Sequence, residues 1–207
     1  MPLVAKVAEL VAIEPTLAEV TPHAQLLSAA YNDPQNAPLL GHDAALSEAE
    51  VLEHYEGLLD AGAHPFLFFV DGALAGDGDL RGIEGGAAEL AFLVAAPSMQ
   101  GKGLGTRFAT MLHAFAFRQL GLERVYASIV PANVASRRVF EKLGCSVDES
   151  EAARAYADDE SDIMMSIDRA TFERLNAEAL SAIAITLRAR GPVPPPTGRA
   201  EPTPGRS

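Results

Sequence analysis

A seven-residue segment with three glycines, residues 100–106, constrains the fold of this chain more than any other feature. It follows an apolar run, residues 90–94, whose length and composition predict a buried strand. Behind it, apolar residues recur at the spacing of a helix, namely Leu104, Phe108, Met111, Leu112 and Phe115. The glycines are therefore predicted to lie in a turn between a strand and a helix.

A turn of this kind favours an anion. Glycines remove side chains from the turn, so a ligand can reach the backbone N–H groups. The first N–H groups of a helix have no partner within the helix, and the helix dipole adds to their preference for phosphates. We expect a pyrophosphate to be bound by the segment Gln100, Gly101, Lys102, Gly103, Leu104, Gly105 and Thr106. The alternative is a glycine-rich loop that only turns the chain.

The glycine spacing distinguishes between the common phosphate-binding motifs. A dinucleotide fingerprint would need glycine in place of Thr106, and a P-loop would need glycine in place of Ala96. The pattern Q-x-x-G-x-G is met by Gln100, Gly103 and Gly105. This pattern resembles the acetyl-CoA-binding motif of the GNAT superfamily of N-acetyltransferases.

A second segment, residues 133–144, strengthens the resemblance. It reads N-V-A-S-R-R-V-F-E-K-L-G and is similar to the second GNAT signature, in which N-x-x-S precedes an aromatic residue, Glu-Lys and glycine. The two motifs and the elements between them cover about the last two-thirds of residues 1–170. The match is closest to the branch that acetylates the N-termini of ribosomal proteins.

The resemblance implies the GNAT fold, an α/β architecture. Its central sheet would be mixed but mostly antiparallel, with about six or seven strands flanked by helices, and with strands 4 and 5 parallel and splayed. We expect the acyltransferase domain to comprise residues 1–170, a C-terminal helix residues 171–190, and a proline-rich disordered tail residues 191–207. The apolar stripe of that helix would pack against the domain or, alternatively, form a homodimer contact.

The resemblance also implies where the co-substrate, acetyl-CoA, would lie. The gap between the splayed strands would expose backbone groups to the pantetheine arm. Three strand residues would line the thioester end: Phe92, Leu93 and Val94. Residues 100–106 would hold the pyrophosphate, and Asn133 would lie beside the pantetheine. Arg137 or Arg138 could reach the adenosine-phosphate end, unless both are only solvated helix charges.

Acetyl transfer to an amine needs a base for the ammonium proton, a donor for the oxyanion and a proton for the leaving thiolate. The resemblance implies Glu89 as the base, because the related branch carries a glutamate at this site; the alternative is a strand-edge glutamate that only faces solvent. The backbone N–H near Val94 would stabilise the oxyanion. Many family members carry a tyrosine acid where this chain has Phe140, and the resemblance to the N-x-x-S pattern of the related branch implies Ser136 as the acid instead. The alternative role of Ser136 is hydrogen bonding at the start of its helix.

The composition of the chain indicates which classes of binding partner are expected. The net charge of −12 disfavours nucleic acid and anionic membranes, and it would attract a basic acceptor. No histidine has metal-ligand spacing with another and the one cysteine is Cys145, so we expect neither a metal nor a disulfide framework. No apolar run approaches a membrane span and residues 1–14 do not resemble a secretory signal, so we expect a cytoplasmic protein.

Together these patterns predict an acetyl-CoA-dependent N-acetyltransferase that acts on a small-molecule or peptide amine. Two alternatives remain at the level of sequence. One is a CoA-binding regulatory module without catalysis, because Phe140 replaces the usual acid and Glu89 has a solvent-facing alternative. The other is a nucleotide-phosphate binder unrelated to CoA.

Overall fold

The computed structural model describes residues 3–40, 45–95 and 100–187, and within them nine strands form one sheet. The strand order is β7-β8-β6-β5-β4-β3-β2-β1-β9. Every neighbouring pair is antiparallel except β5 and β6, which run parallel. The strands are β1 (Leu3–Val7), β2 (Leu10–Ile13), β3 (His64–Val70), β4 (Ala73–Glu84), β5 (Ala87–Val94), β6 (Arg124–Ile129), β7 (Ser146–Val147), β8 (Ile163–Asp168) and β9 (Ala184–Leu187).

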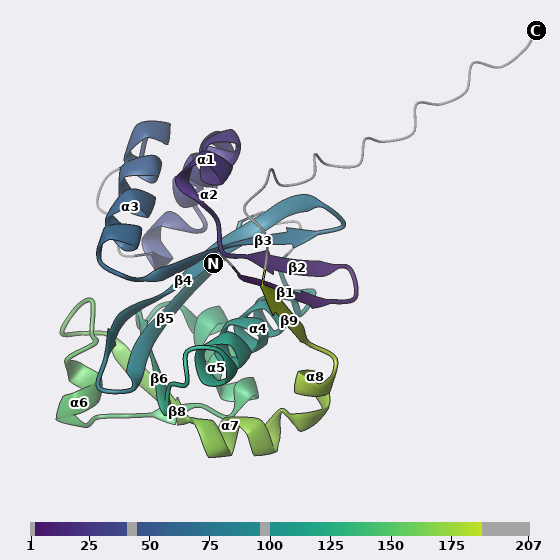
Figure 1. Ribbon diagram of the computed structural model, residues 1–207. Helices are drawn as coiled ribbons and strands as arrows, with labels where there is room; N and C mark the ends of the chain where they lie inside the picture. The colour runs from purple at the N-terminus through teal and green to yellow at the C-terminus, as the bar shows by residue number, and fades with distance from the viewer. Residues whose placement is uncertain (1–2, 41–44, 96–99, 188–207) are drawn as a thin grey trace, which may run out of the picture.

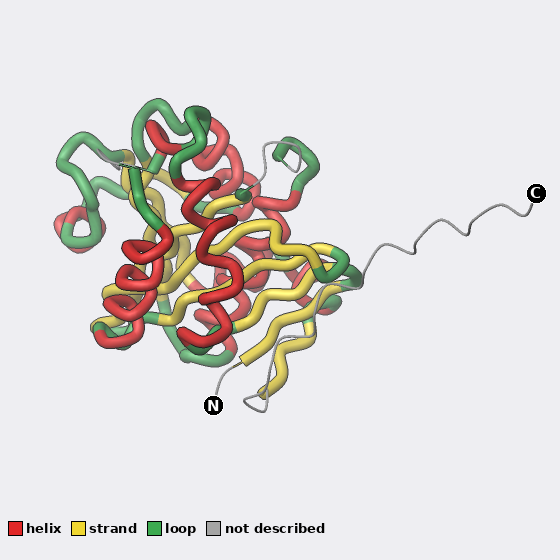
Figure 2. Tube along the Cα trace, turned by 90° about the horizontal axis from the view of Figure 1, so that it is seen from above, coloured by secondary structure: helices red, strands yellow, loops and turns green. Residues whose placement is uncertain are grey.

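Helices cover both sides of this sheet (Figure 1), and Figure 2 shows the strands side by side with helices packed against them. One side carries α1 (Leu17–Val20), α2 (Ala24–Tyr31) and α3 (Glu48–Asp60). The other carries α4 (Leu104–Arg118), α5 (Val134–Leu143), α7 (Arg169–Leu175) and α8 (Ala177–Ser181). Three short segments complete the described chain: the 3₁₀ turns Thr21–His23 and Ala37–Leu39, and α6 (Glu151–Arg154).

The two sides have separate apolar cores. The larger core lies between the sheet and α4, where the rings of Phe68 and Phe108 stack at a centroid distance of 4.3 Å. The smaller core lies under α2 and α3 and includes Leu27, Val51 and Leu67. Because alternate residues of a strand point to opposite faces, the central strands supply side chains to both cores.

The predicted splay of the parallel pair is confirmed. β5 and β6 pair at only three positions, Ala87 with Arg124, Ala88 with Val125 and Glu89 with Tyr126. Beyond Glu89, β5 continues to Val94 while it stays paired with β4, and β6 continues while it stays paired with β8. The last five residues of β5 therefore have no strand partner on their β6 side, and the sheet opens there into a wedge.

The C-terminal region differs from the predicted single helix of residues 171–190. It contains α7, α8 and then β9, which pairs antiparallel with β1. Asn176 separates the two helices, and its side-chain amide donates to the carbonyls of Leu143 and Phe172. A single helical stripe that could form a dimer contact is therefore absent from residues 171–187.

The sheet also has nine strands where about six or seven were expected. The first strand region is a hairpin of two strands, β9 adds an edge, and β7 has only two residues. The predicted end of the acyltransferase domain at residue 170 stays a prediction. Residues 191–207, predicted as a disordered tail, lie outside the described part of the chain.

Candidate functional site

The wedge between β5 and β6 leads into a cleft with two arms, of about 850 Å³ and about 300 Å³. The two arms lie next to each other, because they share part of their lining. The shared residues are Leu39, Leu40, Phe92, Leu93, Asn133 and Ser136. We call them the larger arm and the smaller arm.

The smaller arm is built around the glycine turn. Gly101 and Gly103 have φ values of +72° and +77°, which a side chain would strain, and Gly103 is the N-cap of α4. Apart from the adjoining residues, no described residue has an atom within 4 Å of the position that a Cβ would occupy at either glycine, so the backbone there is open to a ligand. Gly105 serves another purpose, because a Cβ there would lie 3.3 Å from the ring of Phe92.

Of the seven residues predicted for the pyrophosphate, five line the smaller arm: Gln100, Gly101, Gly103, Gly105 and Thr106. Leu104 is buried in the core instead, and Lys102 is exposed and is not among the lining residues. Helical spacing accounts for Leu104, because the same repeat that predicts the helix directs this side chain toward the sheet.

Gln100 ties the turn to the rest of the molecule. Its side-chain amide donates to the carbonyl oxygen of Val94 and to Oδ1 of Asn36, both at 3.1 Å. Asn36 in turn donates to the carbonyl of Ala30 at 2.9 Å. The first glutamine of the motif therefore holds the strand end and the segment after α2 at a fixed distance from the helix start.

The second motif forms the wall that both arms share. Asn133 is the N-cap of α5, and its Oδ1 accepts a hydrogen bond from the backbone N–H of Ser136 at 3.0 Å. Phe140 lines the larger arm and is 2% exposed. Arg138 lines the smaller arm, whereas Arg137 does not and lies 3.5 Å from Glu141. The structure therefore favours Arg138 over Arg137 for contact with a phosphate.

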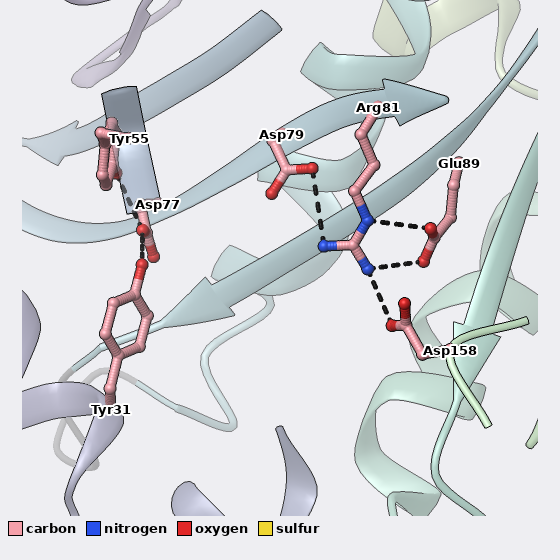
Figure 3. Close-up of polar contacts among 7 residues, drawn as sticks. All are labelled: Tyr31, Tyr55, Asp77, Asp79, Arg81, Glu89 and Asp158. Atoms are coloured by element: carbon pink, nitrogen blue, oxygen red, sulfur yellow. Dashed lines mark hydrogen bonds and ion pairs between the residues drawn. The ribbon is translucent and has the colours of Figure 1, made fainter. Parts of the chain in front are cut away.

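Glu89 is the residue expected to act as the base, and this role stays a prediction. It is the last β5 residue that pairs with β6, at the closed end of the wedge, and it is not among the residues that line either arm. Its two carboxylate oxygens accept hydrogen bonds from Arg81, each of 2.9 Å (Figure 3). Burial raises the pKa of Glu89, while the hydrogen bonds from Arg81 oppose that shift.

The β4 strand carries a stripe of charge that sequence reasoning missed. Asp77, Asp79 and Arg81 alternate along β4 and therefore share one face of the sheet. Tyr31 and Tyr55 both donate their hydroxyl groups to Asp77, the latter at 2.8 Å (Figure 3). Burial raises the pKa of Asp77 to about 6, even though the hydrogen bonds from the two hydroxyl groups oppose that shift. Asp77 therefore connects α2 and α3 to the sheet.

Asp79 lines the larger arm and is only 6% exposed. Its Oδ1 is buried without a hydrogen-bond donor among the described residues, and the nearest guanidinium nitrogen, on Arg81, is 3.9 Å away. Burial raises the pKa of Asp79 to about 7, and the charge of Arg81 opposes that shift. A signal for this site was present in the sequence, because two aspartates at alternate positions are unusual in a buried strand.

Charge divides the cleft along its length. Five carboxylates line the larger arm, against the single guanidinium of Arg81: Asp77, Asp79, Asp158, Asp159 and Asp162. The charged residues that line the smaller arm are Arg138 and Lys142. Among the described residues the smaller arm thus suits an anion and the larger arm suits a cation. No three described side chains of the metal-binding types form a group that could hold a metal ion.

A model of one protein family matches more than half of the chain. The family model described as "Acetyltransferase (GNAT) domain" matches residues 16–146. No curated protein matches the sequence. None of the helices in the described ranges has the length and apolar character to span a membrane.

Solved structures of acetyltransferases share the fold. One is the aminoglycoside acetyltransferase AAC(6')-Ib in complex with coenzyme A, with 19% identity, a TM-score of 0.65, and coverage of 83% of this chain and 98% of that one. Another is RimJ of Mycobacterium smegmatis in complex with CoA-disulfide, with 17% identity, a TM-score of 0.66, and coverage of 88% and 96%. A third is RimL, a ribosomal L7/L12 α-N-protein acetyltransferase, with 20% identity, a TM-score of 0.65, and coverage of 80% and 97%.

Proposed function

Because the chain belongs to the GNAT acetyltransferase family, we propose that it transfers an acetyl group from acetyl-CoA directly to a primary amine. The observation that carries this proposal is the wedge between β5 and β6, which leads to an open glycine turn at the start of α4. A strand edge without a partner beside a helix N-terminus suits a ligand with both an amide-containing arm and a pyrophosphate.

In this proposal the smaller arm holds the coenzyme. The backbone N–H groups around Gly101 and Gly103 bind the pyrophosphate, and the cationic side chains of Arg138 and Lys142 are available to its phosphates. The pantetheine arm runs along the free side of β5 past Phe92, where it pairs as an added strand would. The thioester then lies where the two arms join. Both AAC(6')-Ib and RimL have structures in complex with coenzyme A, which supports this assignment.

The acceptor in this proposal is a cationic amine that enters through the larger arm. The carboxylates of that arm attract an ammonium group and would repel an acidic acceptor. Two kinds of acceptor fit, a small molecule and the free N-terminus of a peptide. Related structures include an enzyme that acetylates aminoglycosides and one that acetylates a ribosomal protein, and both acceptors present amines. A cytoplasmic location stays a prediction.

The amine attacks the thioester carbonyl, and the charge that develops on oxygen is stabilised by the backbone N–H near Val94. Ser136 lines both arms beside the expected position of the sulfur, and we assign it the donation of a proton to the leaving thiolate. Phe140 has no proton to donate. The tetrahedral intermediate collapses to the amide and coenzyme A, without a covalent enzyme intermediate.

Release of free thiol from acetyl-CoA tests the function. The protein is incubated with acetyl-CoA and, in turn, with 1,4-diaminobutane, kanamycin and a peptide with a free N-terminus. We expect at least one of them to release thiol and to gain the mass of an acetyl group. Binding of coenzyme A with no thiol release from any amine would instead indicate a CoA-binding module. Tight binding of NAD or ATP that acetyl-CoA does not displace would contradict the proposal.

A further inference from the structure

We propose that Asp79 is a catalytic residue: it receives the ammonium group of the acceptor and removes the proton that must leave before the nitrogen can attack. This inference rests on the proposed function and names the group that prepares the amine. The side chain of Asp79 lines the larger arm. Its Oδ1 is buried, and no described residue donates a hydrogen bond to it. A buried carboxylate oxygen without a hydrogen-bond partner favours the binding of a ligand that donates a hydrogen bond to it.

The other carboxylates of the larger arm already have donors within the protein. Tyrosine hydroxyls donate to Asp77, and Arg81 donates to Asp158 at 2.7 Å. Hydroxyl groups of serines donate to Asp159 and Asp162 at 2.6 Å and 2.7 Å. No hydrogen bond from a described residue reaches Asp79 at either oxygen. Asp79 is therefore the carboxylate that is available to a ligand.

The position of Asp79 suits the reaction. In the β4–β5 register it lies opposite Ala91, two residues beyond Glu89, where pairing with β6 ends. Ala91 and Asp79 both line the larger arm, next to the stretch of β5 that would run beside the thioester. An ammonium bound at Asp79 is therefore held near the carbonyl that it must attack.

The charged and titratable groups around Asp79 come from every neighbouring element. On β4 they are Asp77 and Arg81, on β5 Glu89, and on the segment after α6 Asp158. From the helices, Tyr31 and His54 line the same arm. Burial raises the pKa of Asp79 to about 7, which places its proton affinity near that of a general base at neutral pH. Primary amines without an electron-withdrawing substituent resemble lysine, so they arrive protonated at that pH.

The carboxylate of Asp79 takes one proton from R–NH₃⁺ and leaves R–NH₂ with a free electron pair. That pair forms the N–C bond, the C–S bond breaks, and the electron pair of C–S goes to sulfur. Ser136 donates a proton that neutralises the thiolate to the thiol, and the second proton lost by the nitrogen restores the hydroxyl of Ser136. The proton on Asp79 leaves to solvent, so the net products are the amide, coenzyme A and one proton.

The first test is equilibrium binding of an ammonium probe. 1,4-Diaminobutane is titrated calorimetrically into the CoA-loaded protein and into its Asp79→Asn variant. We expect at least a tenfold loss of affinity, because the charge-assisted hydrogen bond is removed. Asp60→Asn is the matched control, since Asp60 is an exposed carboxylate on α3 that lines neither arm. Asp79→Ala is measured as well, because it replaces the unpartnered polar group by a methyl and keeps the test valid if the amide disturbs folding.

The second test distinguishes a role of Asp79 in proton removal from a purely structural role. With the protonated amine that is turned over fastest, Asp79→Asn should lower kcat roughly 10²–10⁴-fold. With 2,2,2-trifluoroethylamine, which is already neutral at pH 7, the variant should lose less than tenfold. A merely structural role would lower both rates equally.

Two binding results would overturn the inference: equal binding of the diamine by the wild type and Asp79→Asn, or no diamine binding by the wild type. Equal rate losses with the two amines would overturn it as well. Diamine binding that depends on Asp79, in a protein that acetylates no amine, would support the ammonium site and contradict the proposed function.

Discussion

Arg81 and Glu89 lie directly opposite each other on β4 and β5, and their side chains form two parallel hydrogen bonds of 2.9 Å (Figure 3). The same guanidinium donates to Asp158 at 2.7 Å and lies 3.9 Å from Asp79. Bidentate pairing fixes the plane of a guanidinium. Glu89 therefore holds Arg81 beside Asp79 without allowing it to donate to Asp79, which leaves that carboxylate to the cleft.

Glu89→Gln is expected to change the pH dependence of acetyl transfer. Glutamine carries no charge and accepts fewer hydrogen bonds, so Arg81 would turn toward Asp79 and lower its pKa from about 7. The rise of kcat/KM with pH should then occur at lower pH than in the wild type. The rate at high pH should fall by less than the roughly 10²-fold or more that the loss of a general base costs. A larger loss at every pH, with no rise of rate with pH left, would identify Glu89 itself as the base.

The contribution of Asp79 to folding stability should decrease as the pH rises toward neutrality. The pKa of Asp79 is 3.8 in its usual surroundings and about 7 in the fold, so the folded state binds its proton more tightly than the unfolded state does. The stability that this proton provides is present below about pH 4 and is lost as the pH rises through about 7. Urea unfolding should show Asp79→Asn to be more stable than the wild type at pH 8, by a few kcal/mol at most, with the difference shrinking at low pH. A difference that does not change between pH 4 and pH 8 would show that Asp79 has an ordinary pKa.

Tyr55→Phe should destabilise the protein by about 1–3 kcal/mol at neutral pH, because it leaves Asp77 with one hydroxyl donor in a fully buried site. Since those donors lower the pKa of Asp77, the same change should raise that pKa above about 6. Urea unfolding measures the first effect. Tyr156→Phe is the control, because the hydroxyl of Tyr156 makes only an exposed contact of 3.4 Å with the carbonyl of Glu84. Equal losses in both variants would contradict the assigned role of Tyr55.

Gly103→Ala should weaken binding of coenzyme A by about tenfold or more. At φ +77° an L-residue is strained by about 1–2 kcal/mol, and the new methyl group would stand over the open backbone. Gly57→Ala is the matched control, because Gly57 lies within α3 with no positive φ and no atom near its added Cβ. It should leave affinity unchanged and stabilise the helix by roughly 1 kcal/mol. Calorimetric titration of coenzyme A compares the two, and equal affinities would exclude the glycine turn as the pyrophosphate site.

Elements that depend only on neighbouring residues have their signals in short local motifs. Ser47 and Glu50 form the capping box of α3, and Gly144 ends α5 with a φ of +94°. These features follow from backbone preferences and side chains three or four residues apart, which a sequence displays directly. The prediction of a single C-terminal helix was wrong because it used local spacing alone. Its apolar spacing suits a helix, but pairing of β9 with β1 joins residues at opposite ends of the chain.

The sequence by itself determined the glycine turn, the two motifs and hence the family, because each is a short pattern whose backbone conformation is fixed by its own residues. Only the tertiary structure decided which acidic side chain faces the cleft without a hydrogen-bond donor among the described residues. Asp79 and Glu89 are both buried carboxylates on neighbouring strands, and what separates them is the guanidinium of Arg81, which pairs with one and stays 3.9 Å from the other. The electrostatic state of a carboxylate depends on the groups that folding brings against it, and these are distant in sequence.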